Sequence, residues 1–252
     1  PYSSGRLGGM RIALLADVHS NLAALDAVLA HAAERGYERV WHMGDLVGYG
    51  PDPDAVVARM MAEGASCVLG NHDAAAAGII GAEAFNRVAG EAIQWTISAI
   101  SDTSRSFLAG LPNLDEDGQY TRVHGTASDP IWEYLSTYDS ARRHFANVRT
   151  PYSVVGHTHL PLVVREIEGG DVEASAPEDG ESVELGDGRV CLNPGGVGQP
   201  RDGDPRSSYA LLESGEGRVT FHRVEYDIAL TQGRMREHGL PAMLIERLAR
   251  GR

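Results

Sequence analysis

Residues 11–50 read RIALLADVHSNLAALDAVLAHAAERGYERVWHMGDLVGYG, and this stretch decides the fold class. Residues 11–16 are a continuous apolar run of the kind that forms a buried strand. Asn21 can cap a helix that carries apolar residues at helical spacing and ends at Gly36. Residues 39–43 are a second apolar run. A strand, a helix and another strand in this order predict a sheet with helices packed on it.

The rest of the chain first extends this pattern and then changes it. A helix is predicted over residues 52–63, where Pro53 suits the first turn, followed by a strand over residues 66–69. Residues 74–111 are rich in Ala and predict two or three helices. The second half favours strands and closes with two amphipathic helices; the strands are expected at 120–124, 152–156, 162–167, 189–192, 209–212 and 218–225, and the helices at 229–238 and 241–250. The fold class is therefore α/β, or α+β in some schemes.

The chain is predicted to form one domain over residues 10–252, with the helical segment 74–111 inserted in it. Residues 1–9 are small and polar, so we expect a vector-derived remnant or a disordered arm there. Residues 166–188 are acidic and Gly-rich and contain no aromatic residue, which predicts a solvated hairpin. A lid over the functional site is the alternative for this segment.

Charge and composition disfavour several classes of function. The net charge is −13, opposite in sign to that of proteins that bind nucleic-acid backbones or anionic membranes. All 22 basic residues are arginines, so the lysines of P-loops, kinases and Schiff-base enzymes are missing. No apolar run approaches the ~20 residues that span a bilayer. Cys67 and Cys191 lie in apolar runs, which predicts buried thiols and a reducing, cytoplasmic location.

Five short polar motifs follow apolar, strand-like runs: Asp17-Val18-His19, Gly44-Asp45, Gly70-Asn71-His72-Asp73, His124-Gly125 and Gly156-His157-Thr158-His159. Because the carboxyl ends of such strands share one rim of a sheet, residues far apart in sequence can meet there. Residues two apart, such as Asp17 and His19, point to the same side of an extended chain. The neighbouring glycines let the backbone turn sharply.

The residue types in these motifs are typical of a metal site. Imidazole nitrogens with Asp or Asn oxygens, and no Cys, suit Mn, Fe, Zn or Ni better than Ca. Seven such residues are too many for one tetrahedral ion, so they predict two divalent ions that share a bridging carboxylate. Asp45 is the natural bridge.

Each of these residues taken alone has an ordinary explanation. A lone His is usually a surface or hydrogen-bonded core residue, and a lone Asp after a strand is usually a turn residue. Five of the ten histidines, however, fall in Gly-flanked motifs that follow strands, which chance would seldom produce. The remaining histidines are assigned to ordinary structural positions: His31, His42, His144, His222 and His238.

The five motifs, in this order, resemble the signature of the calcineurin-like metallophosphoesterases over most of residues 10–213. Residues 193–201, NPGGVGQPR, further resemble a loop of the small prokaryotic phosphodiesterase-like branch. The resemblance implies two packed mixed β-sheets flanked by helices, an αββα sandwich, with a dimetal site at the strand ends. It assigns one metal to Asp17, His19 and His159, the other to Asn71, His124 and His157, and the bridge to Asp45.

The resemblance also implies a reaction. A hydroxide that bridges the two metal ions would hydrolyse a phosphoester bond. His72 directly follows a ligand position, so it is the candidate to protonate the leaving oxygen or to steady the transition state. Asp73 could orient the His72 ring by a hydrogen bond.

The preferred substrate is a small phosphodiester or phosphomonoester. The Arg201 guanidinium could donate hydrogen bonds to a phosphate oxygen; an ion pair with Asp202 or Asp204 is the alternative. Tyr49 either lines the pocket or packs its loop.

Three other functions fit the same fold: a non-catalytic scaffold, a protein phosphatase and a nuclease. The complete ligand set disfavours the scaffold. The acidic balance and the 6% aromatic content disfavour a nucleic-acid polymer as partner. A protein phosphatase stays open. Exposed apolar helix surface could support a homodimer.

Overall fold

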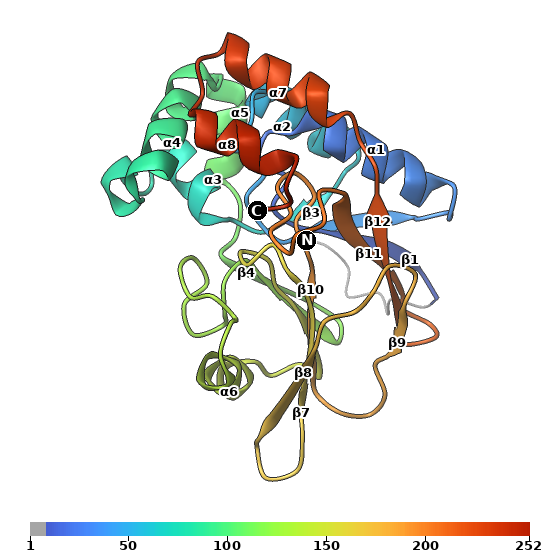
Figure 1. Ribbon diagram of the computed structural model, residues 1–252. Helices are drawn as coiled ribbons and strands as arrows, with labels where there is room; N and C mark the ends of the chain where they lie inside the picture. The colour runs from blue at the N-terminus through green and yellow to red at the C-terminus, as the bar shows by residue number, and fades with distance from the viewer. Residues whose placement is uncertain (1–8) are drawn as a thin grey trace.

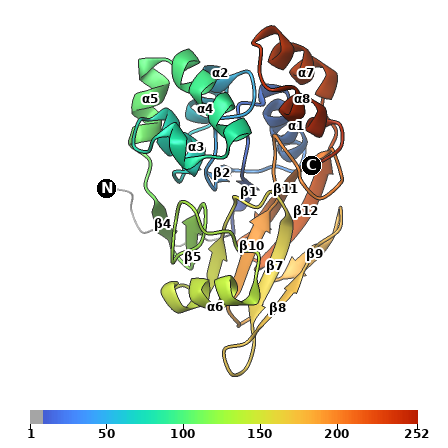
Figure 2. The ribbon, with the colours of Figure 1, turned by 60° about the vertical axis from the view of Figure 1, so that its left-hand side comes forward.

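The computed structural model describes residues 9–252, so the remnant or arm predicted for residues 1–9 lies, apart from Gly9, outside the described residues. Within this range, twelve strands form two six-stranded sheets that pack face to face with helices outside them (Figure 1; Figure 2). Both sheets mix parallel and antiparallel pairs. The predicted α/β class with two packed mixed sheets is confirmed.

The first sheet has the strand order β3-β2-β1-β11-β12-β9. Its parallel half consists of β1 (Arg11–Leu15), β2 (Arg39–His42) and β3 (Ser66–Cys67), connected by α1 (Leu22–Ala33) and α2 (Pro53–Ala62). Its antiparallel half consists of β11 (Ser207–Glu213), β12 (Arg218–Val224) and β9 (Ser182–Glu184). The carboxyl ends of the three parallel strands therefore share one rim.

The second sheet has the strand order β4-β5-β6-β10-β7-β8. Its strands are β4 (Leu114–Asp117), β5 (Tyr120–Val123), β6 (Tyr152–Val154), β10 (Val190–Pro194), β7 (Pro161–Glu166) and β8 (Val172–Ser175). Strands β5, β6 and β10 are parallel. The polar motifs at His124 and Gly156 follow β5 and β6, so they lie at the carboxyl ends of this sheet as well.

The core follows from the alternation of side chains along the central strand β1. Ile12 and Leu14 are fully buried between the two sheets, whereas Ala13 and Leu15 are buried against the helices on the other face. A strand that is buried on both faces must be apolar at every position, which explains the continuous apolar run. β1 therefore anchors the residues that follow it.

Helices cover the outer faces of both sheets. Those at the first sheet are α1, α2, α3 (Asn71–Ala76), α4 (Arg87–Ala99), α5 (Asp102–Ala109), α7 (Ile228–Glu237) and α8 (Ala242–Leu248), with a 3-10 turn at Ala82–Ala84 (Figure 1). Helix α6 (Tyr138–Asn147) packs Ala141 and Phe145 against the second sheet. None of the helices in residues 9–252 has the length and apolar character needed to cross a membrane.

Two elements, β4 and α6, were not predicted from the sequence. The residues of β4, LDED, carry no apolar alternation, because this strand lies at the edge of its sheet and stays partly exposed. Helix α6 is short, and Thr137 and Ser140 form a capping box at its start. Short elements with so few apolar residues give a weak hydrophobic signal from which to predict them.

The acidic segment 166–188 supplies edge strands to both sheets. β7 and β8 form an antiparallel hairpin in the second sheet, and β9 joins the first sheet beside β12. β7 starts two residues after His159 and runs away from it, so the hairpin turn lies a strand length from the polar rim (Figure 1). The β7–β8 turn therefore does not cover the polar rim, and a lid formed by the rest of the segment stays a prediction.

Candidate metal centre

Five of the predicted ligands have left-handed backbone conformations. The φ angles are 54° at Asp17, 49° at His19, 61° at Asp45, 66° at His157 and 59° at His159. Such angles are uncommon outside glycine and cost on the order of 1–3 kcal/mol each. The expectation that residues two apart converge as in an extended strand is therefore wrong. They converge because strained loops at the strand ends turn both side chains inward.

The ligand loops are fastened to one another across the two sheets. The His19 N–H donates to the carbonyl oxygen of Asp45 at 3.0 Å, which joins the loops after β1 and β2. The His157 N–H donates to Asp17 Oδ1 at 3.2 Å, which joins the second sheet to the first. These bonds offset part of the strain and fix where the side chains point.

Gly70 serves close approach of the chain rather than a turn. A Cβ at this position would lie 2.1 Å from Asp45 Oδ1 and 2.3 Å from the Asp45 nitrogen. Gly48 is required both for a left-handed backbone angle, with φ of +92°, and for close approach, because a Cβ would lie 2.3 Å from His72 Nδ1. The two glycines let the loop that carries Asp45 and the start of α3, which carries His72, pack directly against each other.

Two histidines at the first sub-site face each other through unprotonated nitrogens. Nδ1 of His19 lies 3.1 Å from the Val47 carbonyl oxygen, and Nδ1 of His159 lies 2.6 Å from that of Gln199. A carbonyl oxygen only accepts, so each Nδ1 carries the proton and each neutral ring has its lone pair on Nε2. The two Nε2 atoms are 3.1 Å apart. Asp17 completes this group, with Oδ1 3.5 Å from His159 Nε2.

The second sub-site repeats the arrangement. Nδ1 of His124 donates to the Met43 carbonyl oxygen at 2.7 Å, and Nε2 of His157 donates to that of Trp132 at 3.3 Å. The remaining nitrogens, His124 Nε2 and His157 Nδ1, are 3.0 Å apart. Asn71 Oδ1 also lies 3.1 Å from His124 Nε2. All three atoms, Asn71 Oδ1, His124 Nε2 and His157 Nδ1, are hydrogen-bond acceptors. A positive charge placed among them would satisfy all three.

Asp45 stands between the two groups. Its Oδ2 is 3.6 Å from His19 Nε2 and 3.4 Å from His124 Nε2, so one carboxylate oxygen faces both sub-sites. Burial by itself would raise the pKa of Asp45, but the surrounding histidines hold this pKa well below its usual range. Burial opposes a charge on His124 too, yet Asp45 raises the His124 pKa to about 9. The centre therefore attracts positive charge, as a proton or as a metal ion.

The residues fit two divalent ions. Each of the clusters Asp17–His19–His159 and Asp45–His124–His157 has its ligand atoms within 4.8 Å of one another, and all of these residues are buried. Oδ2 of Asp17 is buried and has no hydrogen-bond partner among residues 9–252. Carbonyl-bound histidines with inward lone pairs are the usual surroundings of metal-ligating imidazoles. The donor set of nitrogens and carboxylate oxygens suits Mn, Fe, Zn or Ni.

His72 lies beside the centre, but Asp73 does not orient its ring. The His72 N–H donates to Asp45 Oδ1 at 2.9 Å, while its Nδ1 is buried without a partner in the described chain. Both Asp73 oxygens accept backbone bonds instead, from the N–H groups of Asp45 at 2.8 Å and Val47 at 3.1 Å. The predicted Asp73–His72 hydrogen bond is wrong, because the helix that starts at Asn71 turns Asp73 toward the Asp45 loop.

Tyr49 and Arg201 flank the centre on the same side. The Tyr49 ring centroid is 4.6 Å from that of His19 and 4.4 Å from that of His72. The Arg201 guanidinium lies over Tyr49, 5.8 Å from its centroid, and donates to Gln199 Oε1 at 3.0 Å.

The alternative in which Arg201 pairs with a neighbouring aspartate is not what the structure shows. Asp202 pairs with Arg223, and Asp204 pairs with Arg206. Within the described part of the chain, no carboxylate forms an ion pair with Arg201. Its charge thus stays available beside the centre.

Three aromatic residues near the centre were missed by the sequence analysis. Tyr134 stacks on His157 with centroids 3.8 Å apart and remains 47% exposed. Trp132 contacts Phe85, which in turn contacts His72. The signal available was two aromatic residues in the loop just after the His124-Gly125 motif. Exposed aromatic rings beside a polar centre form a surface on which a flat ligand group can stack.

Comparisons with known proteins agree with this geometry. The family profile of the calcineurin-like phosphoesterase superfamily domain matches residues 10–217. The crystal structure of a metallophosphoesterase from Sphaerobacter thermophilus is 47% identical, covers 97% of this chain and 100% of its own, and has a TM-score of 0.89.

Two curated proteins are also similar to this chain. An uncharacterized protein of Methanocaldococcus jannaschii is 34% identical over 247 residues, which cover 96% of this chain and 98% of that protein. A symmetrical bis(5′-nucleosyl)-tetraphosphatase of Bordetella pertussis is 46% identical over 63 residues, which cover 23% of each chain. The first likeness spans nearly the whole chain and the second only a segment.

Proposed function

This chain belongs to the calcineurin-like phosphoesterase superfamily, and from that premise we propose that it hydrolyses a phosphoester bond of a small molecule with two divalent metal ions. One observation carries the proposal. Four buried histidines, each fixed by a backbone carbonyl, direct their free nitrogens toward one another around the buried carboxylate of Asp45. This arrangement stabilises cations and has no other evident use in the fold.

Seven residues would hold the ions. Asp17, His19 and His159 would bind one, Asn71, His124 and His157 the other, and Asp45 both. When bound, the ions would supply an activated water and positive charge opposite the phosphoryl oxygens. Manganese, iron, zinc and nickel all suit these ligands.

The residues around the centre would bind and orient the phosphoester. The His72 ring lies beside Asp45 and His19, so we assign it the hydrogen bond to the leaving oxygen. Asp73 is a positioning residue, since it holds the backbone of the Asp45 loop through two N–H groups. Arg201 and Tyr49 would bind the phosphoryl group and the organic part beside it.

A small substrate is favoured over a polymer or a protein. The net charge of −13 opposes a nucleic-acid backbone. The exposed Tyr134 ring on His157 gives a flat organic group, such as a nucleobase, a place to stack. The segment shared with the Bordetella nucleosyl-tetraphosphatase supports the same class. Cys67 and Cys191 are free and buried, which suits a reducing compartment such as the cytoplasm.

The test is hydrolysis of bis-p-nitrophenyl phosphate and p-nitrophenyl phosphate with Mn²⁺, with Zn²⁺ and with chelator. We expect turnover that needs metal and that vanishes in Asp45→Ala, whereas Asp26→Ala, a surface aspartate on α1, keeps it. The ratio of the two rates distinguishes a diesterase from a monoesterase. Absence of turnover with every metal, together with no bound metal by elemental analysis, would leave the scaffold function instead.

A further inference from the structure

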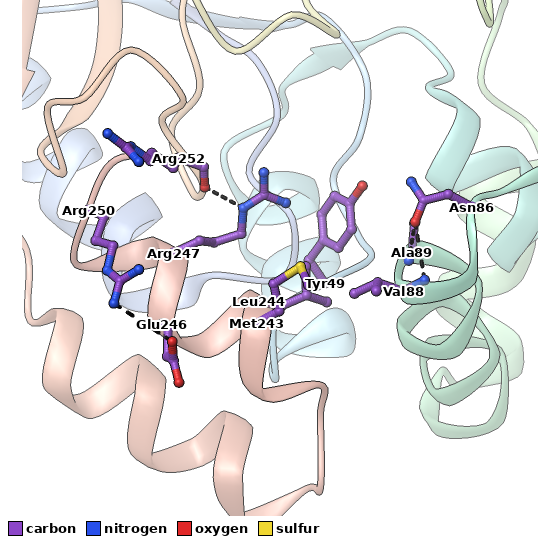
Figure 3. A pocket seen from close by; sticks show the side chains of 10 residues that line it. All are labelled: Tyr49, Asn86, Val88, Ala89, Met243, Leu244, Glu246, Arg247, Arg250 and Arg252. Atoms are coloured by element: carbon purple, nitrogen blue, oxygen red, sulfur yellow. Dashed lines mark hydrogen bonds and ion pairs between the residues drawn. The ribbon is translucent and has the colours of Figure 1, made fainter.

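A cavity of about 440 Å³ lies next to the metal centre, between helices α4 and α8 (Figure 3). Its walls are Asn86, Val88 and Ala89 on one side and Leu244 and Arg247 on the other, with the Tyr49 ring between them. Helix α8 lies beyond residues 10–217, the part that the superfamily profile matches. One wall of the cavity therefore comes from outside the part of the chain that the superfamily profile matches.

The Tyr49 ring is the wall shared by the cavity and the metal centre. One of its faces lines the cavity, and its centroid is 4.6 Å from the His19 ring and 4.4 Å from the His72 ring. A molecule bound at the metals could thus reach the cavity by passing one aromatic ring. The Arg201 guanidinium lies over the same ring, 5.8 Å from its centroid.

The side chains that line the cavity carry more positive than negative charge, since three of them are arginines and one is a glutamate. Arg247 is partly buried; burial lowers its pKa, and the nearby charge of Arg201 lowers that pKa further. Its Nε donates to the main-chain oxygen of Arg252, and no Asp or Glu side chain among residues 9–252 forms an ion pair with its guanidinium. Arg250 and Arg252 add charge at the rim, where Glu246 meets Arg250 only at 3.8 Å. The net charge of the chain is −13, yet Glu246 is the one acidic residue among those that line the cavity, so this excess of arginines favours an external anion.

The opposite wall offers a further donor. Oδ1 of Asn86 accepts the N–H groups of Val88 and Ala89 at 3.1 Å, as the cap of α4. Its Nδ2 is left to donate, and Figure 3 shows Asn86 and Arg247 on opposite sides of Tyr49. A planar guanidinium matches two phosphate oxygens at once, and an amide can bind a third.

We propose that this cavity binds a second phosphoryl group of the substrate, with Arg247 as the specificity-determining residue. The inference rests on the proposed phosphoesterase function and narrows its substrate class to small molecules with two phosphoryl groups. One group lies at the metals, and the other lies beyond Tyr49 against Arg247. At about 440 Å³ the cavity also has room for the organic group that carries the second phosphate.

The test measures binding, by calorimetry on Mn²⁺-loaded protein. The probes are alkanediol bisphosphates with two, four and six carbons, each compared with the alkyl monophosphate of the same length. We expect at least one bisphosphate to bind the wild-type protein about 10–100-fold more tightly than its monophosphate, as a charge-assisted pair of hydrogen bonds would give. Arg247→Gln should abolish this tighter binding of the bisphosphate. Arg247→Lys, which keeps the charge without the paired N–H donors of the guanidinium, should retain part of it.

Arg236→Gln on α7 is the matched control, because it removes one exposed arginine outside the cavity. It should keep the bisphosphate advantage in full. The proposal is overturned if no bisphosphate binds better than its monophosphate, or if Arg247→Gln keeps the advantage. Hydrolysis of bis-p-nitrophenyl phosphate, recorded separately, decides the proposed function whatever the outcome at Arg247.

Discussion

Buried histidines occur in two regions of this protein and behave differently. At the metal centre, His19, His124, His157 and His159 each give one nitrogen to a backbone carbonyl, and the other nitrogen meets another acceptor. On helix α6, His144 is just as buried, but both of its ring nitrogens have hydrogen-bond partners. Its Nδ1 accepts the Ala127 N–H at 3.1 Å, and its Nε2 donates to Ser153 Oγ at 2.8 Å.

The contrast shows that burial alone does not indicate a metal ligand. His144 completes a hydrogen-bond network that connects α6 to the second sheet, so it needs no cation. The histidines of the metal centre have lone pairs that only a positive charge can satisfy. A metal ion should therefore stabilise the first region and leave the second unchanged, and the His144 region can be tested by pH.

The largest effect is expected from His124→Ala compared with His144→Ala. His124 is a proposed ligand of the second ion, so we expect its loss to lower metal-dependent turnover on the order of 10³-fold or more. The thermal stabilisation of the wild-type protein by Mn²⁺ should shrink as well; at one thousand times Kd a single site contributes about 4 kcal/mol. Turnover and the shift of Tm with Mn²⁺ are the two measurements.

His144→Ala should lower Tm equally with and without Mn²⁺, because it leaves the Ala127 N–H unsatisfied, and should keep the metal-induced shift. If both variants respond to Mn²⁺ like the wild-type protein, His124 does not take part in metal binding and the two regions do not differ. The contrast between the regions also fails if His144→Ala loses the metal-induced shift.

The next effect concerns pH. Burial, with help from Arg189, lowers the pKa of His144 to about 4 from an ordinary value near 6.5. The folded state therefore favours the neutral ring, and the unfolded chain binds the proton first as pH falls. The lowered pKa of His144 therefore contributes about 3 kcal/mol to the free energy of unfolding above pH 6.5, and this contribution is lost as the pH falls from 6.5 to about 4.

His144→Gln does not titrate, so the difference in unfolding free energy between it and the wild-type protein should narrow as pH falls through this window. Urea unfolding at several pH values measures that difference. Ionisation at the metal centre is common to both proteins and cancels in it. Parallel pH profiles for the two proteins would show that His144 is not held neutral by the fold.

The smallest effect is expected at the glycine that faces Asp45. Gly70→Ala would place a Cβ 2.1 Å from Asp45 Oδ1, so the bridging carboxylate must move. We expect turnover and Mn²⁺ affinity to fall about 10–100-fold, as when the support of a metal ligand is lost. Gly188→Ala, where no atom lies within 4 Å of the added Cβ, is the matched control. If Gly70→Ala keeps Mn²⁺ affinity, the close packing of the two loops does not position Asp45.

The sequence predicted the alternating first half of the fold well, because buried strands such as residues 11–15 are apolar at every position. It predicted neither the edge strand β4 nor the helix α6, since β4 has no apolar alternation and the buried face of α6 includes only two apolar residues, Ala141 and Phe145. It identified which residues gather at the rim, from their places after the strands. It misjudged how Asp73 and the paired ligands are oriented, because left-handed backbone angles depend on contacts made elsewhere.

The sequence by itself determined the family, the order of elements and the positions of seven candidate ligands, because each of these is written in short local motifs. Only the tertiary structure decided which nitrogen of each histidine points inward, since the carbonyls that set this belong to other loops. It also decided that Arg247 lies beside Tyr49, some two hundred residues earlier in the chain. Contacts across such separations arise from the packing of sheets and helices, which no local motif encodes.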